Sequence, residues 1–279
     1  PNGDPDAGNL PRLDPETMHG LVTDVCIKRK VRNFVDFTRG NEERFKIYVQ
    51  EGVALNTKHK RAYEAMKLKS TGTKQAKDDV DKAREWMCQN FYDIRMFGAV
   101  MTTEVNCGQV RGPVQLTFAR SISPIVPLDL SITRVAVTRE EDAQVVVGEE
   151  GEAEGPAKRT EMGRKPILPY GLYKGYGFFS PHFAQLTGVT REDLELFWTA
   201  LEKAWEMDRS ASRGLMACRG LYIFTHENSL GNAHAHQLFD RIQVRLKEGI
   251  ASPRSFSDYI VEINDKNLPN GITLTILVG

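Results

Sequence analysis

Three basic side chains in residues 23–33 could bind phosphate groups without reading the bases of a nucleic acid. The segment predicts the start of a helix, because Thr23 can cap it and Asp24 suits the positive end of its dipole. An apolar stripe at helical spacing follows, formed by Ile27, Val31 and Phe34. On the flank of this stripe lie Lys28, Arg29 and Arg32. A cationic helix flank suits a phosphate backbone; a solvated helix face is the alternative.

Three further groups of polar residues could extend this binding surface. They are a basic segment (56–69), a glycine-flanked loop (107–113) and the basic end of an insertion (138–168). The candidate residues in these groups are Lys58, Lys60, Gln109, Arg111, Arg159, Arg164 and Lys165. Together they could line a groove around a sheet, as in proteins that bind single-stranded nucleic acid. His59 lies in the basic segment, and we expect it to contact phosphate or solvent.

The insertion at residues 138–168 has two interpretations. Its middle (149–155) is acidic, which favours a disordered surface loop. Its return side is basic and strands are predicted on both sides, which favours a long hairpin arm with a mobile tip. We expect the arm.

Two clusters, one acidic and one of histidines, contain residue types that could bind a metal. Asp4 and Asp6 could bind a divalent cation with Asp24, but in a loop rich in Pro and Gly they are better explained as turn formers. The histidines of the second cluster are His226, His234 and His236. They lack a nearby cysteine, and the residues 231–233 between them are turn-like, which disfavours zinc. No nucleophile–base pair or nucleotide-binding loop is evident, so we expect no enzyme activity, metal or cofactor.

The composition excludes several classes of protein. The 279 residues carry 37 basic and 37 acidic side chains, and this neutral balance counts against a free, nonspecific nucleic-acid binder. The four cysteines form no CxxC pair, which suggests reduced thiols in a cytoplasmic protein. No run approaches the roughly 20 apolar residues of a membrane span. Because a chain does not naturally start at Pro1, we expect a strand before it.

The predicted elements alternate between helices and strands, which indicates an α+β fold. Thr190 with Asp193 resembles a capping box at the start of one helix. The helices are expected at 74–92, 190–207 and 237–246, and a short apolar turn at 97–101. The strands are expected at 114–122, 132–137, 170–179, 221–225, 259–263 and 272–278.

Five segments, in order, resemble one known family. They read PNGDPDAGN (1–9), TDVCIKRKVRN (23–33), FGAVM (97–101), RGPVQLTFARSI (111–122) and YGLYKGYGFFSP (170–181). They are similar to the backbone subunit of the type I-C CRISPR Cascade complex, the Csd-type member of CRISPR-associated family seven in the RAMP superfamily. The resemblance runs over nearly the whole chain, which begins inside the loop that follows the family's first strand.

The resemblance implies a single domain over residues 1–279. Its palm would be a modified RRM-like (ferredoxin-like) fold, with helical fingers inserted at 38–112 and a β-hairpin thumb at 138–168. Several copies would stack along one guide RNA (crRNA), each thumb folding over the RNA into its neighbour. The bases would stay exposed to pair with a target DNA strand, as sequence-independent binding requires. The implied partners also include the processing, large and small Cascade subunits, and no membrane.

The resemblance also implies roles for particular residues. Lys28, Arg29 and Arg32 would contact the RNA backbone, with Thr23 at the start of their helix. Gln109, Arg111 and Gln115 would lie near the RNA where the palm meets the fingers.

Two other functions stay open. One is a metal-dependent ribonuclease on the same fold, as in type III backbone subunits, with Asp4, Asp6 or Asp24 as metal ligands. The other is a monomeric RNA-binding protein unrelated to CRISPR.

Overall fold

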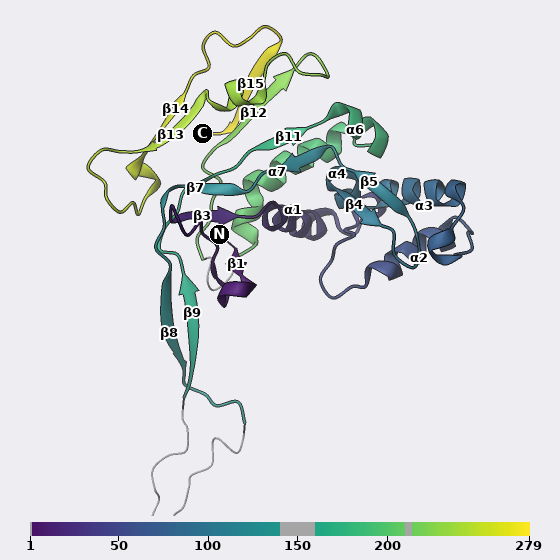
Figure 1. The fold of residues 1–279 in the computed structure, drawn as a ribbon, viewed down its shortest axis with the longest axis horizontal. Helices are drawn as coiled ribbons and strands as arrows, with labels where there is room; N and C mark the ends of the chain where they lie inside the picture. Colours follow the sequence, from purple (N-terminus) through teal and green to yellow (C-terminus); the bar gives the residue numbers. More distant parts are fainter. Residues whose placement is uncertain (1, 140–159, 210–213) are drawn as a thin grey trace, which may run out of the picture.

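The fold combines helices with small antiparallel sheets, which confirms the mixed α and β composition (Figure 1). The computed structural model describes residues 2–139, 160–209 and 214–279. At the N-terminus, β1 (Gly3–Asp4) and β2 (Leu10–Pro11) flank a short 3-10 helix, η1 (Pro5–Ala7). The described part of the segment 1–9 therefore turns tightly, as its Gly and Pro content predicts.

The centre of the molecule holds a three-stranded sheet in the order β10-β7-β3. These strands are β3 (His19–Val22), β7 (Ala119–Pro124) and β10 (Tyr173–Lys174). A separate pair joins β6 (Val114–Leu116) to β11 (Gly177–Phe179).

The predictions of unbroken strands at 114–122 and 170–179 are wrong. Both segments are interrupted at the same level, where the Thr117 hydroxyl accepts a hydrogen bond from the backbone N–H of Tyr176. The Thr117 N–H in turn donates to the Tyr176 carbonyl. Each segment thus contributes to two sheets, which local alternation of side chains does not reveal.

Helix α1 (Asp24–Arg39) packs along α7 (Arg191–Met207) and forms one hydrophobic core with it. The Thr23 hydroxyl accepts from the N–H of Cys26, and both bonds of the Thr190/Asp193 capping box are present. The predicted starts of both helices are therefore confirmed. Residues buried in this core include Val31, Phe34, Val35, Phe197 and Ala200.

A second hydrophobic core lies beneath α2 (Leu55–Ala65) and α3 (Lys77–Asn90). Helix α4 (Tyr92–Phe97) follows α3 and leads directly into β4 (Gly98–Met101), which pairs with β5 (Gly108–Arg111). Gly98 permits this change of direction because its φ is +79°, a conformation unfavourable for other residues. The segment 97–101, predicted as an apolar turn, thus contains the last residue of α4 and the whole of β4.

Strands β8 (Leu128–Arg134) and β9 (Glu161–Ile167) form a hairpin that projects from the body, on the side away from α2 and α3 (Figure 1). The strand predicted at 132–137 begins four residues earlier, at Leu128. Most of the predicted insertion, including Arg159, lies outside the described residues. The short helix α6 (Pro181–Thr187) follows β11.

The C-terminal part contains two further strand pairs. Strand β12 (Leu221–His226) pairs with β15 (Ile272–Val278), and β13 (Ile242–Leu246) pairs with β14 (Tyr259–Ile263). The strands expected in these regions are confirmed. The helix predicted at 237–246 is wrong: α8 (Ala235–Phe239) is short, and the residues after it form β13. Ile242, Val244 and Leu246 alternate with polar residues, and pairing with β14 overrides their helical propensity.

Candidate nucleic-acid interface

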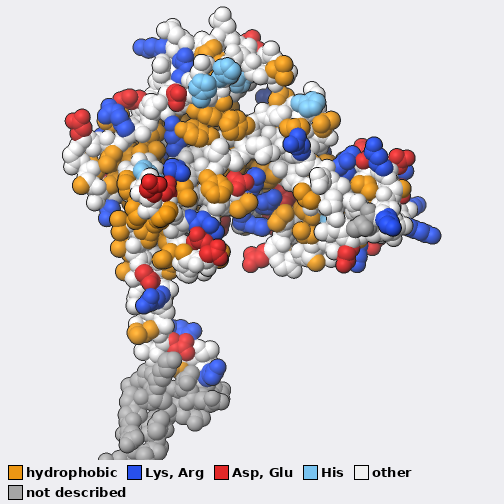
Figure 2. Space-filling model, viewed as in Figure 1, with side chains coloured by type: hydrophobic (Ala, Val, Ile, Leu, Met, Phe, Trp, Pro, Cys, Tyr) orange, Lys and Arg blue, Asp and Glu red, His pale blue; other side chains and the backbone are white. Residues whose placement is uncertain are grey.

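A groove runs between α1, the segment 46–51 and α2; we call it the α1 groove. It consists of two cavities, of about 390 and about 250 Å3, which share Asp36, Ile47 and Gln50 as lining residues. Figure 2 shows Lys and Arg side chains gathered in a recess of the surface at the level of α1. The basic lining residues are Arg29, Arg32, Lys46, Lys58 and Arg61, and the acidic ones are Asp36, Glu43 and Glu51.

The two groove arginines on α1, Arg29 and Arg32, are each held by a hydrogen bond to a neighbouring segment of the fold. Arg29 donates through Nη1 to the carbonyl of Val49 at 2.8 Å. Arg32 donates through Nε to Oδ2 of Asp93 at 2.7 Å, and its guanidinium lies 5.4 Å from the centre of the Phe97 ring. Each of these guanidinium groups has further N–H donors, so each can hold a phosphate while keeping its anchor.

Lys58 is buried at the other end of the groove. Its ammonium donates to the carbonyl of Ile47 and, at 3.0 Å, to Oε1 of Gln50. Burial lowers the pKa of Lys58, although the carboxylates of Asp93 and Asp36 act in the opposite direction. The structure thus gives Lys58 a role in holding the groove wall.

The expectation that His59 contacts phosphate or solvent is wrong. The side chain has no exposed surface, and Nε2 lies 2.7 Å from the hydroxyl of Tyr48. Burial lowers the pKa of His59, which favours the neutral ring. Lys60, the next residue of α2, is exposed.

Lys28 and Thr23 lie near the start of α1 and do not line the groove cavities. The Lys28 ammonium is 2.8 Å from Oδ2 of Asp24, one turn earlier. Thr23 is buried and caps the helix. Of the three basic residues predicted to act together, the structure therefore brings Arg29 and Arg32 into one site and leaves Lys28 to the side.

The candidates Gln109, Arg111 and Gln115 are exposed on β5 and β6. The Arg111 guanidinium lies 5.7 Å from the centre of the Phe183 ring. Gln115 stands opposite Phe178 in the β6–β11 pair. These positions are accessible to a ligand but form a group separate from the α1 groove cavities.

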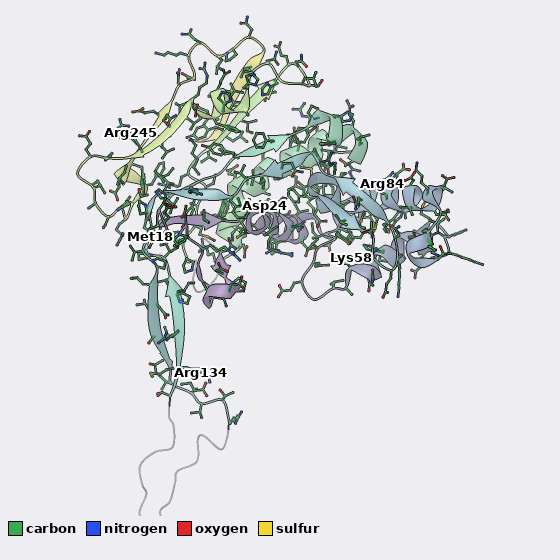
Figure 3. The ribbon with its side chains drawn as sticks, viewed as in Figure 1. Met18, Asp24, Lys58, Arg84, Arg134 and Arg245 are labelled. Carbon is green, nitrogen blue, oxygen red and sulfur yellow. The ribbon has the colours of Figure 1, made fainter. Side chains whose placement is uncertain are left out.

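Arg164 and Lys165 lie on the projecting hairpin. Arg164 is exposed and 3.2 Å from the carboxylate of Asp129, and Lys165 stands opposite Leu130. In Figure 3, Lys58 lies on the part of the molecule that carries α2, and Arg134 lies on the projecting hairpin. Arg164 and Lys165 line neither cavity of the α1 groove.

Sequence reasoning missed several residues of the groove. Asn33, Lys46 and Gln50 line it, but the segment 41–55 has no periodicity or motif that points to binding. The only available signal was the position of Asn33 at the end of the basic helical segment.

The histidine and aspartate clusters show no metal-binding arrangement. No group of three or more His, Cys, Asp or Glu residues is placed for a metal within the ranges 2–139, 160–209 and 214–279. Asp4 accepts from the N–H of Asp6, and Asp24 pairs with Lys28. The rings of His234 and His236 stack with their centres 5.7 Å apart.

Among the described helices, none combines the length and the apolar character that crossing a bilayer requires.

Comparison with known proteins identifies the family. The family described as CRISPR-associated protein Cas7 matches residues 1–264. The chain therefore belongs to the Cas7 family. It is similar to the CRISPR-associated protein Cas7 of Haloferax volcanii, with 25% identity over 289 residues, covering 95% of this chain and 77% of that protein.

The chain is also similar to part of a solved structure described as a CRISPR RNA-guided surveillance complex, pre-nicking. One chain of that complex aligns with a TM-score of 0.48 and 12% identity, over 87% of this chain and 80% of the other.

Proposed function

We propose that this Cas7 chain is the non-catalytic, crRNA-binding backbone subunit of a type I-C CRISPR interference complex (Cascade). Copies of the chain would polymerise along the guide RNA, hold its sugar-phosphate backbone and present its bases to a target DNA strand. Membership of the Cas7 family supports this assignment in general, and the five quoted segments support the subtype. The observation that carries it is the α1 groove, in which anchored arginines line a recess of the surface.

The chemistry of the groove suits a ribose-phosphate chain. Arg29 and Arg32 can donate to phosphate oxygens, which are the same in every nucleotide. Asp36 and Glu51 can accept hydrogen bonds from ribose 2′-hydroxyl groups, which DNA lacks. A groove that combines both kinds of group can bind RNA without preference for its sequence.

The hairpin supports the proposed contact between neighbouring copies. Leu128, Leu130 and Ile132 alternate along β8, so they share one face, and each is at least 40% exposed. An isolated two-stranded hairpin is only marginally stable in water. We propose that β8 and β9 form the base of a thumb that extends through residues 138–168 and packs against the next copy.

The remaining parts follow the same assignment. The palm would contain the sheet β10-β7-β3 in a modified RRM-like arrangement, and residues 38–112 would form the fingers. Thr23, Lys28, Lys60, Gln109, Arg111, Gln115, Arg159, Arg164 and Lys165 stay as candidate RNA contacts. Zero formal charge suits a filament, because stacked subunits of high charge would repel one another.

Electron microscopy of the chain co-expressed with a repeat-spacer RNA tests the proposal. We expect a regular filament with one arm per subunit and more copies on longer guides. Monomers bound singly to RNA would contradict polymerisation. In parallel, the assembled particle is incubated with complementary RNA and Mg²⁺; regularly spaced cuts that disappear in Asp4→Ala, Asp6→Ala or Asp24→Ala would contradict the non-catalytic assignment.

A further inference from the structure

Asp93 lies behind the α1 groove and connects two parts of its wall, α1 and the segment 46–51. The side chain is 1% exposed, on the first turn of α4. Oδ1 accepts from the N–H of Tyr48 at 2.7 Å, and Oδ2 accepts from the N–H of Val49 at 3.0 Å. Oδ2 also accepts from Nε of Arg32 at 2.7 Å. Both oxygens are therefore used, and none of these bonds involves a residue near Asp93 in sequence.

The segment 47–50 that Asp93 fixes also anchors two more of the groove cations, Arg29 and Lys58. Arg29 donates to the carbonyl of Val49, and Lys58 donates to the carbonyl of Ile47 and to the side chain of Gln50. Cations from α1 and α2 are thus held by one short piece of backbone. If that backbone moves, the spacing of the cations changes with it.

We propose that Asp93 is a positioning residue for RNA binding. Its carboxylate fixes Tyr48 and Val49, aims the Arg32 guanidinium into the groove and so sets the spacing at which phosphates are held. Asp93 itself is too deeply buried to touch RNA. The inference rests on the proposed function, because it assumes that the α1 groove binds the RNA backbone.

The direction in which RNA affinity changes when the Asp93 carboxylate is removed distinguishes a positioning role from a purely electrostatic one. A carboxylate close to an anion-binding site repels phosphate, so its removal should strengthen RNA binding if charge alone mattered. The positioning role predicts the opposite, because Arg32 loses its anchor and the segment 47–50 loses two hydrogen bonds.

The decisive variants are Asp93→Asn and Asp93→Glu, measured by fluorescence anisotropy with a labelled single-stranded RNA. Asp93→Asn removes the charge and keeps only one acceptor oxygen. Its NH2 group therefore faces either the N–H of Tyr48 or the donors of Val49 and Arg32. Asp93→Glu keeps the charge but lengthens the side chain. We expect both to weaken binding at least fivefold, about the effect of removing one hydrogen bond. We also expect a weaker salt dependence: the negative slope of log K against log salt should become shallower by about 0.7 for each phosphate that the variant no longer neutralises.

The matched control is Asp81→Asn, which removes a partly exposed carboxylate from α3, away from the groove cavities. It should leave RNA affinity unchanged or slightly raise it. Thermal unfolding and circular dichroism show whether each variant is folded at the assay temperature. If Asp93→Asn does not fold, the comparison rests on Asp93→Glu, for which a charge-only role predicts no change.

A double-mutant cycle with Arg32→Gln completes the test. We expect Asp93→Asn to cost less in the Arg32→Gln background than in the wild type, because the two residues act together. If Arg32→Gln weakens binding while folded Asp93 variants stay within twofold of the wild type, the positioning role is overturned and the proposed function stands. If Arg32→Gln itself has no effect, the proposed function of the groove fails.

Discussion

The guanidinium Nη2 of Arg95 lies 2.6 Å from Oδ1 of Asp193, and neither side chain has any exposed surface. The pair connects α4, which also carries Asp93, to the first turn of α7. Asp193 additionally accepts from Arg44 at 2.7 Å and from the N–H of Thr190 at 2.8 Å. Helix α4 therefore contacts the α1 groove through Asp93 and the start of α7 through the buried Arg95–Asp193 pair.

Replacing Asp193 by Ala should destabilise the protein by about 3–5 kcal/mol, because it leaves the buried Arg95 charge without its partner. It also removes the capping box of α7. Urea denaturation measures the loss. Glu195→Ala is the control, since the pair that Glu195 forms with Arg191 is exposed and should contribute little. Equal midpoints for the two variants would show that the buried network does not stabilise the fold.

His59 should make stability depend on pH. Burial lowers its pKa below the usual 6.5, so the unfolded state binds more protons than the folded state as the pH falls through 6.5. The stability associated with the neutral ring is full above this pH and decreases below it. We expect urea midpoints to fall more for the wild type than for His59→Gln between about pH 7.5 and about pH 5.5. The same fall in both proteins would assign the pH dependence to other groups.

The groove should prefer RNA to DNA of the same sequence. If Asp36 accepts a hydrogen bond from a ribose 2′-hydroxyl, a 2′-deoxy guide should bind several-fold more weakly, as expected for the loss of one or more net hydrogen bonds of about 1 kcal/mol each. Asp36→Asn should reduce this discrimination, because an amide is a weaker acceptor. Competition between RNA and DNA oligonucleotides measures the ratio in each protein. An unchanged ratio in Asp36→Asn would exclude this carboxylate as the source.

Local signals explain which parts of the fold were predictable. Helices α1 and α7 were found because their caps, Thr23 and Thr190, and their apolar spacing lie within the segments themselves. The strands β12, β14 and β15 were likewise predicted from their own residues, whereas β13 was predicted as part of a helix that ends with the short α8. The break shared by β6–β7 and β10–β11 depends on Thr117 and Tyr176, which are 59 residues apart, and no local pattern records it.

The candidate site was predictable only in part for the same reason. The basic flank of α1 indicated Arg29 and Arg32 as neighbours, and both line one cavity; their binding of RNA stays a prediction. The anchors of these arginines are Val49 and Asp93, which are 20 and 61 residues away in sequence. Lys58 and His59 are likewise buried against the segment 47–50, where Lys58 bonds to Ile47 and Gln50 and His59 to Tyr48. The composition of α2 does not indicate these contacts.

The central claim is that the α1 groove holds the RNA backbone irrespective of sequence. The most direct test is the affinity of the wild type and an Arg29→Gln/Arg32→Gln variant for three RNAs of equal length and unrelated sequence, over a range of salt. We expect the variant to lose affinity to the same extent for all three RNAs, with the salt slope reduced by about 0.7 for each phosphate left without an arginine. Unchanged affinity, or a loss confined to one sequence, would contradict the claim.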